Sequence, residues 1–224
     1  MISIAIDGPA GAGKSTVAKI LSKELGFIYF DTGALYRALG YYFVNNKIDY
    51  TNVHLLVNNL NKADITFKFV GNEQRMILCG EDITDSIRSN QISMAASRIS
   101  AIPEAREYLL NAQREMATKS NVIMDGRDIG TVVLPYANVK IFLTADVRVR
   151  AWRRFRQLRQ KDIGIRYIDV LKQVKERDKN DTEREISPLV PAKDAIIVNT
   201  TMLTLNRTIN KLIKIVRKRI DGKK

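Results

Sequence analysis

The chain has 224 residues, 45% of them hydrophobic and 27% charged, which is the composition of an ordinary soluble globular protein with a substantial core. No apolar run approaches the roughly 20 residues that a membrane-spanning helix needs, and the single cysteine, Cys79, excludes an intrachain disulfide or a multi-cysteine metal site. The formal net charge of +13 indicates an anionic partner, but it does not separate nucleic acid or an anionic membrane from small phosphorylated ligands.

The amino-terminal residues and the cysteine content indicate a compartment. MISIAIDG carries neither a basic segment nor a cleavage site, so we expect no signal peptide. A single cysteine fits a reducing environment, and we expect Cys79 to be an inert strand residue. Together these features predict a cytoplasmic protein.

The first elements predict a strand, a tight turn and a helix in immediate succession. Residues 3–6 are short, apolar and β-branched, which indicates a buried parallel strand. Residues 8–13 form the turn, and the periodicity of residues 14–25 predicts a helix that ends at Gly26. A second strand is expected at residues 27–30.

A segment of different character interrupts this alternation. DTG, from Asp31, opens a predicted helix that runs to about residue 44, and Thr51 or Asn52 caps another. From residue 65, the stretches ITFKFV, GNEQ and RMILCG predict a β-hairpin with alternating faces. We interpret this hairpin as a small insert.

The second half of the chain continues the alternation of strands and helices. We predict helices at about residues 91–98, 103–118, 145–160 and 167–180, strands at residues 122–124, 139–143 and 195–198, and a loop at residues 161–165. KLIKIVRKRIDGKK predicts a terminal helix with an apolar face on the core and a basic face in solvent. The alternation predicts an α/β fold, a parallel β-sheet with helices on both faces, whose ligands bind at the C-terminal ends of the strands.

A phosphate-binding motif lies between the first strand and the first helix. Gly8, Gly13, Lys14 and Ser15 satisfy the pattern G-x-x-x-x-G-K-[ST]. The glycines let backbone N–H groups point inward, the helix adds its positive end, and Lys14 can reach the β- and γ-phosphates. The Ser15 hydroxyl is a candidate ligand for Mg²⁺. The loop therefore predicts a nucleoside triphosphate as ligand.

Other motifs separate the classes of phosphate-loop protein. Residues 61–64 spell N-K-A-D, a guanine-reading pattern, but they follow a helical segment, and no aspartate has a glycine three residues later. We therefore interpret them as a helix end and not as part of a GTPase. VIMD is an apolar strand that ends in Asp125, which is expected to hold Mg²⁺ beside Ser15. Gly126 follows where a nucleic-acid motor usually has glutamate, which favours transfer to a bound acceptor over hydrolysis.

An acceptor needs an anion site of its own, and three segments offer one. Arg37 lies one turn into the helix that DTG opens, and Arg127 follows the VIMD strand. In KERDKNDTER, Arg177, Asp181 and Arg184 share one face if the segment is helical. Guanidinium groups there suit a phosphate and the carboxylate suits a ribose hydroxyl, although a salt-bridged, solvated helix face remains the alternative.

Five motifs in order make the chain similar to a known family. DGPAGAGKST, DTGALYRA, MDGRDIGTVV, KERDKNDTER and SPLVPAKDA resemble those of bacterial cytidylate kinase, one of the nucleoside-monophosphate kinases. The resemblance implies a single domain over residues 1–224, with a core, a monophosphate-binding insert at about residues 63–95 and a mobile lid at about residues 153–168. It also implies transfer of the γ-phosphoryl group of ATP to CMP or dCMP, with Mg²⁺, in pyrimidine metabolism.

The resemblance further implies roles for individual residues. The ATP phosphates would be bound by Gly8, Pro9, Ala10, Gly11, Ala12, Gly13, Lys14, Ser15 and Thr16, and Mg²⁺ by Ser15 and Asp125. The acceptor phosphate would be bound by Arg37, Arg127 and Arg184, its sugar by Arg177 and Asp181, and its base by Ser97, Arg106 and Asp128. Thr32 would lie near the acceptor phosphate or sugar, and Tyr36 would line the acceptor pocket. Lys14, Arg127 and Arg184 would be catalytic. For Ser97 and Tyr36, the alternative is that they only pack.

The lid and the adenine wall are also expected from the resemblance. Some of Arg153, Arg154, Arg156 and Arg159 would reach the transferring phosphoryl group, and residues 188–195 would wall the adenine. Family members often end the last strand with aspartate, whereas this chain has Asn199, so an essential acid there is in doubt. His54, the only histidine, is expected to be a surface or packing residue without an acid–base role.

The predicted partners are small molecules. We expect a monomer that binds ATP and CMP or dCMP and binds neither nucleic acid nor membrane, because convergent arginines on two nucleotides would explain the positive charge. A kinase for another small acceptor, or a basic ATPase that binds nucleic acid, is the alternative.

Overall fold

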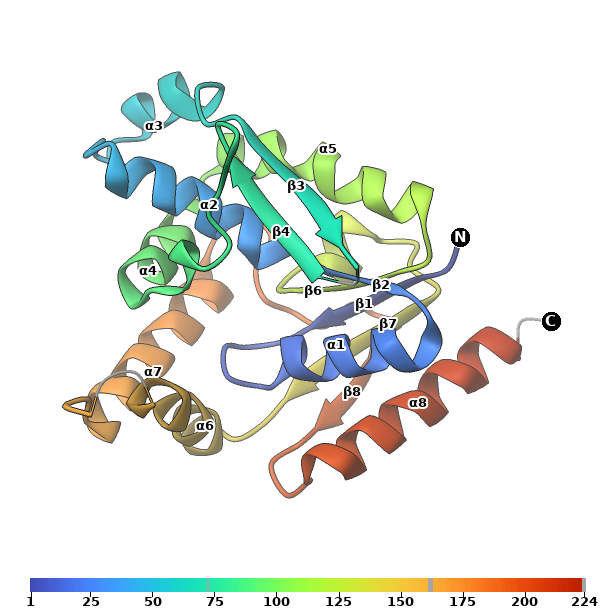
Figure 1. The fold of residues 1–224 in the computed structure, drawn as a ribbon. Coiled ribbons are helices and arrows are strands. Elements are labelled where there is room, and N and C mark those ends of the chain that lie inside the picture. The colour runs from blue at the N-terminus through green and yellow to red at the C-terminus, as the bar shows by residue number, and fades with distance from the viewer. Residues whose placement is uncertain (72, 161–162, 223–224) are drawn as a thin grey trace.

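The core of the protein is a five-stranded parallel sheet. The computed structural model describes residues 1–71, 73–160 and 163–222, in which the strands lie in the order β2–β6–β1–β7–β8 (Figure 1). Their bounds are β2 (Ile28–Asp31), β6 (Val122–Gly126), β1 (Ser3–Asp7), β7 (Val139–Thr144) and β8 (Ile196–Asn199). Every neighbouring pair is parallel, so the C-terminal ends of all five strands meet at one edge of the sheet.

Alternating side chains divide the sheet between two apolar clusters. Ile4 and Ile6 of β1 pack in the cluster under α1 (Lys14–Leu25) and α8 (Leu205–Asp221), which lie side by side (Figure 1). Ala5 belongs to the cluster on the other face, formed with α2 (Thr32–Asn45), α4 (Asn90–Ile99) and α5 (Pro103–Lys119). Both faces are covered, which confirms the predicted α/β fold.

A small antiparallel sheet forms the insert. After α3 (Val53–Leu60), strands β3 (Ile65–Val70) and β4 (Glu73–Leu78) pair as the predicted hairpin, and β4 also pairs with β5 (Glu81–Asp82), which the sequence pattern did not indicate. A short 3₁₀ turn (Ser86–Arg88) leads to α4. His54 is exposed on α3, and residues 61–64 follow the end of that helix, as expected. Asn72, in the predicted hairpin turn, lies outside the described residues.

The expectation that Cys79 lies within a strand is wrong. Cys79 and Gly80 form the two-residue connection between β4 and β5, and both have positive φ, 48° and 86°. Two consecutive positive φ values are typical of a tight hairpin turn whose twist matches that of the flanking strands. Cys79 is therefore exposed on a turn, and its thiol lies 3.7 Å from the carbonyl oxygen of Lys62.

The helices α6 (Val147–Arg159) and α7 (Tyr167–Glu183) have an apolar cluster of their own, formed by Ala151, Phe155, Val170 and Val174. The predicted loop between these helices includes Lys161 and Asp162, which lie outside the described residues. A short π-helical turn (Ile129–Val133) after β6 was not indicated by the sequence pattern. In the described ranges, no helix combines the length and the apolar character that crossing a bilayer requires.

Candidate functional site

The phosphate-binding motif forms the connection from β1 to α1. Gly8 has a φ of 144°, and a Cβ atom built on it would lie 2.0 Å from the carbonyl oxygen of Leu143, so no side chain fits there. Gly13, with a φ of 95°, is the N-cap of α1. The loop therefore brings its backbone to the positive end of a helix, where N–H groups can receive phosphate oxygens.

Lys14 lies along the inside of this loop. Its ammonium group donates to the carbonyl oxygen of Pro9 at 3.0 Å, and its side chain is buried. Burial, together with the nearby charge of Arg127, lowers the pKa of Lys14 to about 7. An anion bound in the loop would stabilise the ammonium form of Lys14, because its charge compensates for the hydration that Lys14 loses on burial.

Ser15 and Asp125 meet at the strand edge, as the motif spacing predicts. The Ser15 hydroxyl donates to one carboxylate oxygen of Asp125 at 2.9 Å, and the Tyr29 hydroxyl donates to the other at 2.6 Å. Burial raises the pKa of Asp125, and the neighbouring Asp31 contributes to that rise. The Asp125 carboxylate would therefore be stabilised by a bound cation.

The oxygen donors at this point fit Mg²⁺ held jointly with a nucleotide. Among the described residues, no group of three or more His, Cys, Asp or Glu side chains could hold a metal ion by itself. Mg²⁺ typically takes one or two protein oxygens and completes its shell with water and substrate phosphates. The adjacent oxygens of Ser15 and Asp125, beside the phosphate loop, are such a pair.

A second polar cluster lies after the end of β6. Asp128 accepts a hydrogen bond from Arg106 and lies 3.6 Å from Nη2 of Arg184. The guanidinium group of Arg106 lies 5.7 Å from the centre of the Tyr36 ring, within cation–π range. Arg106 also donates to the carbonyl oxygen of Ser100 at 3.0 Å. Four predicted acceptor residues from four separate segments are therefore neighbours.

Arg127 and Asp181 form a direct ion pair, with 2.6 Å between Nε and Oδ2. Burial acts to raise the pKa of Asp181, but the charges of Arg127 and Arg177 hold that pKa below its ordinary value. Nε of Arg177 is buried, and none of the described residues is its hydrogen-bond partner. Burial, with the charge of Arg127, lowers the pKa of Arg177 to about 10. Arg177 therefore has a buried donor free for a ligand.

Two more orphaned polar groups line a hollow of about 360 Å³ between α4 and the end of α7. Ser97 Oγ and Arg184 Nη2 are buried and have no hydrogen-bond partner in the part of the chain that the structure describes, and both residues line this hollow with Asp181. Such groups are unfavourable unless a ligand or water pairs with them, which supports a binding role for Ser97. Arg184 lies one residue beyond α7 in extended backbone, so only Arg177 and Asp181 share the predicted helix face.

Arg37 is held at the end of β2. Its guanidinium group pairs with Asp31 at 2.7 Å, and the backbone N–H of Asp31 donates to Gln74 of β4 at 2.8 Å. The Thr32 hydroxyl donates to the carbonyl oxygen of Asp125 at 2.8 Å, so Thr32 fastens β2 to β6 in this structure. Through Gln74, the insert contacts the end of β2, where Asp31 pairs with Arg37, a predicted acceptor-phosphate residue.

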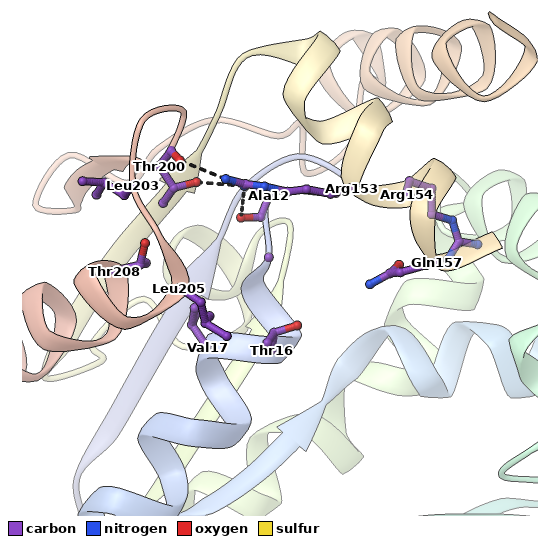
Figure 2. Close-up of a pocket in the computed structure, with 12 residues that line it drawn as sticks. Ala12, Thr16, Val17, Arg153, Arg154, Gln157, Thr200, Leu203, Leu205 and Thr208 are labelled. Atoms are coloured by element: carbon purple, nitrogen blue, oxygen red, sulfur yellow. Dashed lines mark hydrogen bonds between the residues drawn. The ribbon is translucent and has the colours of Figure 1, made fainter. Parts of the chain in front are cut away.

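A cavity of about 290 Å³ adjoins the phosphate loop (Figure 2). Its lining residues are Gly11, Ala12, Gly13, Thr16, Val17, Arg153, Arg154, Gln157, Thr200, Leu203, Leu205 and Thr208. Arg153 donates to the hydroxyl and to the carbonyl oxygen of Thr200, at 3.0 and 2.9 Å (Figure 2). Arg156 and Arg159 are exposed, so only Arg153 and Arg154 of the four lid arginines line the cavity.

The adenine wall expected at residues 188–195 is not at this cavity. That segment is engaged elsewhere, since the N–H of Leu189 donates to the carbonyl oxygen of Asp181, and Asp194 pairs with Lys140. The segment after β8 lines the cavity instead, because the C-terminal end of β8 emerges at the same sheet edge as the phosphate loop.

Comparison with known proteins agrees with this arrangement. The sequence profile of the family described as cytidylate kinase matches residues 4–218. The chain belongs to the cytidylate kinase family. The cytidylate kinase of Caldicellulosiruptor saccharolyticus is 48% identical over 221 residues, which cover 99% of this chain and 98% of that protein. That of Carboxydothermus hydrogenoformans is 49% identical over 219 residues, 97% and 98% of the two chains.

The fold of this member of the cytidylate kinase family also resembles a solved structure. A crystal structure of an uncharacterized protein from Eubacterium ventriosum aligns with 96% of the chain, with a TM-score of 0.52 and 14% identity. At this identity the likeness shows the fold alone. Family membership makes the chain an ATP-dependent nucleoside-monophosphate kinase.

Several contacts at the site of this member of the cytidylate kinase family were not predicted from the sequence. Arg150 of α6 donates to the carbonyl oxygen of Ala10 at 3.0 Å and pairs with Asp178 at 2.7 Å. Tyr29 and Asp7 are polar groups within short apolar strands, and that was the one available signal for them. Their partners are distant in sequence, so spacing could not reveal the contacts.

Proposed function

We propose that the protein transfers the γ-phosphoryl group of ATP to CMP or dCMP, which yields ADP and CDP or dCDP in pyrimidine nucleotide metabolism. The proposal is carried by one observation: a phosphate loop and a second site, whose buried arginine nitrogens lack hydrogen-bond partners among the described residues, lie at the same edge of the sheet. Membership of the cytidylate kinase family supports cytidine nucleotides as the acceptor.

The donor would bind at the phosphate loop. Residues 8–16 would hold the phosphates of ATP, with Lys14 at the β- and γ-phosphates and the adenine in the cavity beside Thr200. When bound, Mg²⁺ neutralises charge on these phosphates, and Ser15 and Asp125 would hold it. Arg153 closes this side of the cavity through its bonds to Thr200.

The acceptor would bind at the second cluster. Arg37, Arg127 and Arg184 would hold its phosphate, and Arg177 and Asp181 its sugar. Ser97, Arg106 and Asp128 offer a hydroxyl, a guanidinium group and a carboxylate to the edge of the base, beside the Tyr36 ring. This mixture of donors and acceptors suits the amino and carbonyl groups of cytosine.

The chemistry would need no proton-abstracting side chain. A phosphate oxygen of CMP attacks the γ-phosphorus in line, the bond from that phosphorus to the β–γ bridging oxygen breaks, and ADP leaves. The attacking oxygen is already anionic near neutral pH. Lys14, Arg127 and Arg184 would stabilise the negative charge of the phosphoryl group in the transition state, since catalysis of this kind depends on positioning and electrostatics.

An acceptor panel tests the proposal. Purified protein is given ATP, Mg²⁺ and CMP, dCMP, UMP, AMP or GMP, and ADP release is measured by a coupled assay. CMP and dCMP should have the highest kcat/KM, and Asp128→Ala should narrow the discrimination between CMP and UMP. If CMP and dCMP remain unphosphorylated while added polynucleotide accelerates ATP hydrolysis, the chain is instead an ATPase that binds nucleic acid.

The same proposal covers the localisation, oligomeric state and partners of the protein. We propose that it acts in the cytoplasm as a monomer on these small molecules, and that it binds neither nucleic acid nor membrane. The convergence of Lys14, Arg106 and Arg184 on the two proposed nucleotide sites supports small phosphorylated ligands as the partners.

A further inference from the structure

Asp7 is a buried carboxylate to which the proposed reaction gives no role. It is the last residue of β1 and directly precedes Gly8, the first residue of the phosphate loop. Only 4% of its surface is exposed. One carboxylate oxygen accepts the backbone N–H of Ile129 at 2.8 Å, and the other accepts that of Gly130 at 2.7 Å. The whole side chain is thus committed to two consecutive backbone groups.

Those two N–H groups belong to the segment that follows Arg127 and Asp128. The sheet register places Asp7 beside Gly126, so the carboxylate spans from β1 to the loop that leaves β6. A Cβ atom on Gly130 would lie 3.3 Å from the Asp7 carboxylate and 3.1 Å from the Lys140 side chain, so the absence of a side chain allows this close approach. Asp7 fixes the exit direction of the loop.

The loop that Asp7 fixes carries two acceptor-site residues. Arg127 pairs with Asp181 and Asp128 accepts from Arg106, on two elements that flank the acceptor site. The orientation of the Arg127 and Asp128 side chains depends on the conformation of the backbone that follows them. Because Asp7 is also the residue before the phosphate loop, one side chain sets the acceptor loop relative to the donor loop.

The Asp7 carboxylate is costly to keep ionised where it lies. Burial raises its pKa to about 6, and the charge of Asp128 contributes to the rise, while the two backbone hydrogen bonds and Lys14 oppose it. The hydrogen bonds from Ile129 and Gly130 offset part of that cost, so they tie the side chain to the loop after Asp128.

We propose that Asp7 is a positioning residue for the acceptor: its carboxylate holds the backbone after Asp128 so that Arg127 and Asp128 are aimed at the monophosphate bound opposite the phosphate loop. The inference rests on the proposed function. It assigns Asp7 no contact with substrate, so its removal changes acceptor binding and selectivity, and leaves donor binding intact.

The variant Asp7→Asn tests this role. An amide keeps the shape but presents an N–H₂ group to one of the two backbone donors, so one hydrogen bond is lost. We expect KM for CMP to rise by about tenfold through misplacement of the acceptor groups, with the CMP-over-UMP preference reduced and KM for ATP within about twofold of the parent. Relief of the buried charge and the unpaired backbone donor act in opposite directions on stability, so the melting temperature at pH 7 should change by only a few degrees. Equal rises in KM for both substrates, or no change in either, would overturn the proposal.

A matched control and a coupling test sharpen the result. Asp49→Asn makes the same chemical change at a carboxylate that accepts the N–H of Thr51 in an exposed loop, and it should leave all kinetic constants unchanged. In Asp7→Asn/Asp128→Ala, the losses of CMP-over-UMP preference should not add, because Asp7 acts through the loop that carries Asp128. Additive losses would refute that route.

Hydrogen exchange separates this inference from the proposed function. In the parent protein the amides of Ile129 and Gly130 should exchange slowly, and in Asp7→Asn at least one should exchange quickly, whether or not CMP is a substrate. Parent protein that fails to phosphorylate CMP refutes the proposed function alone. Unchanged exchange in the variant refutes the positioning role alone.

Discussion

Lys14 is a buried ionisable group at the phosphate loop, so we expect nucleotide binding to change its protonation. In the unliganded protein, desolvation is the main cause of its low pKa and the charge of Arg127 adds to it, while Asp125 acts in the opposite direction. The unfolded chain holds a lysine with its ordinary pKa near 10.5. The folded state therefore binds fewer protons than the unfolded state between about pH 7 and 10, and the associated loss of stability is present in full below pH 7 and fades as the pH rises.

ATP should reverse this effect by restoring the ammonium form of Lys14. We predict that ATP binding at pH 8 takes up a proton, because the phosphates stabilise the charged lysine. Calorimetric titrations in buffers of different ionisation enthalpy measure that uptake directly. Lys14→Met should bind ATP more weakly and without proton uptake. Proton uptake that persists in Lys14→Met would show that another group titrates.

At the scale of elements, the site is made by strand ends. The parallel register places Asp31 beside Asp125 and Asp7 beside Gly126, so three strands deliver their polar residues to one edge. The insert contacts the end of β2 through Phe67, whose ring lies 4.9 Å from that of Phe30. It also contacts it through Gln74 of β4, which accepts the backbone N–H of Asp31, whose carboxylate holds Arg37. The hairpin therefore supports the end of β2 from outside the main sheet.

Gln74→Leu tests that support. The substitution leaves the Asp31 N–H without its acceptor, at a cost of roughly 1–3 kcal/mol, and loosens the partner of Arg37. We expect a several-fold rise in KM for CMP and an unchanged KM for ATP in steady-state assays. Arg75→Met is the matched control, because Arg75 is the next residue of the same strand and pairs only within the insert, with Asp82. A rise in KM for CMP in both variants would mean that any damage to the hairpin has this effect.

Sequence patterns predicted the elements and motifs well because those signals are local. The phosphate loop, the strand ending in Asp125 and the hairpin each depend on residues a few positions apart. Contacts across the fold escaped prediction: Asp7 and Gly130 are 123 positions apart, and Arg150 and Ala10 are 140. The lining of the cavity beside the phosphate loop also escaped prediction, since only the strand order shows that β8 ends there.

At the scale of the molecule, the ligand edge concentrates buried positive charge. Burial lowers the pKa values of Lys14, Arg177 and Arg184, and the neighbouring cations contribute in each case. Nε of Arg177 and Nη2 of Arg184 have no hydrogen-bond partner. The unliganded fold therefore carries an electrostatic strain that bound phosphate groups relieve, a case of stability given up for binding.

Thermal unfolding should reveal this strain. CMP at about 100 times its Kd should stabilise the fold by about 2.7 kcal/mol, and sodium chloride of equal ionic strength should have a much smaller effect. Arg177→Met removes a buried, unpaired cation, so its unliganded form should melt at a higher temperature than the parent while its response to CMP is largely lost. A lower melting temperature for unliganded Arg177→Met would contradict the strain.

One uninterrupted helix, α7, ties two distant parts of the molecule together. Its first half contributes Val170 and Val174 to the small cluster shared with α6, and its last turns carry Arg177 and Asp181. Because its 17 residues span about 25 Å, we expect that any tilt of the helix on acceptor binding would displace the aromatic rings at its other end. The only tryptophan of the chain, Trp152, lies there, 5.9 Å from the Tyr167 ring, and we expect its fluorescence to change when the acceptor binds.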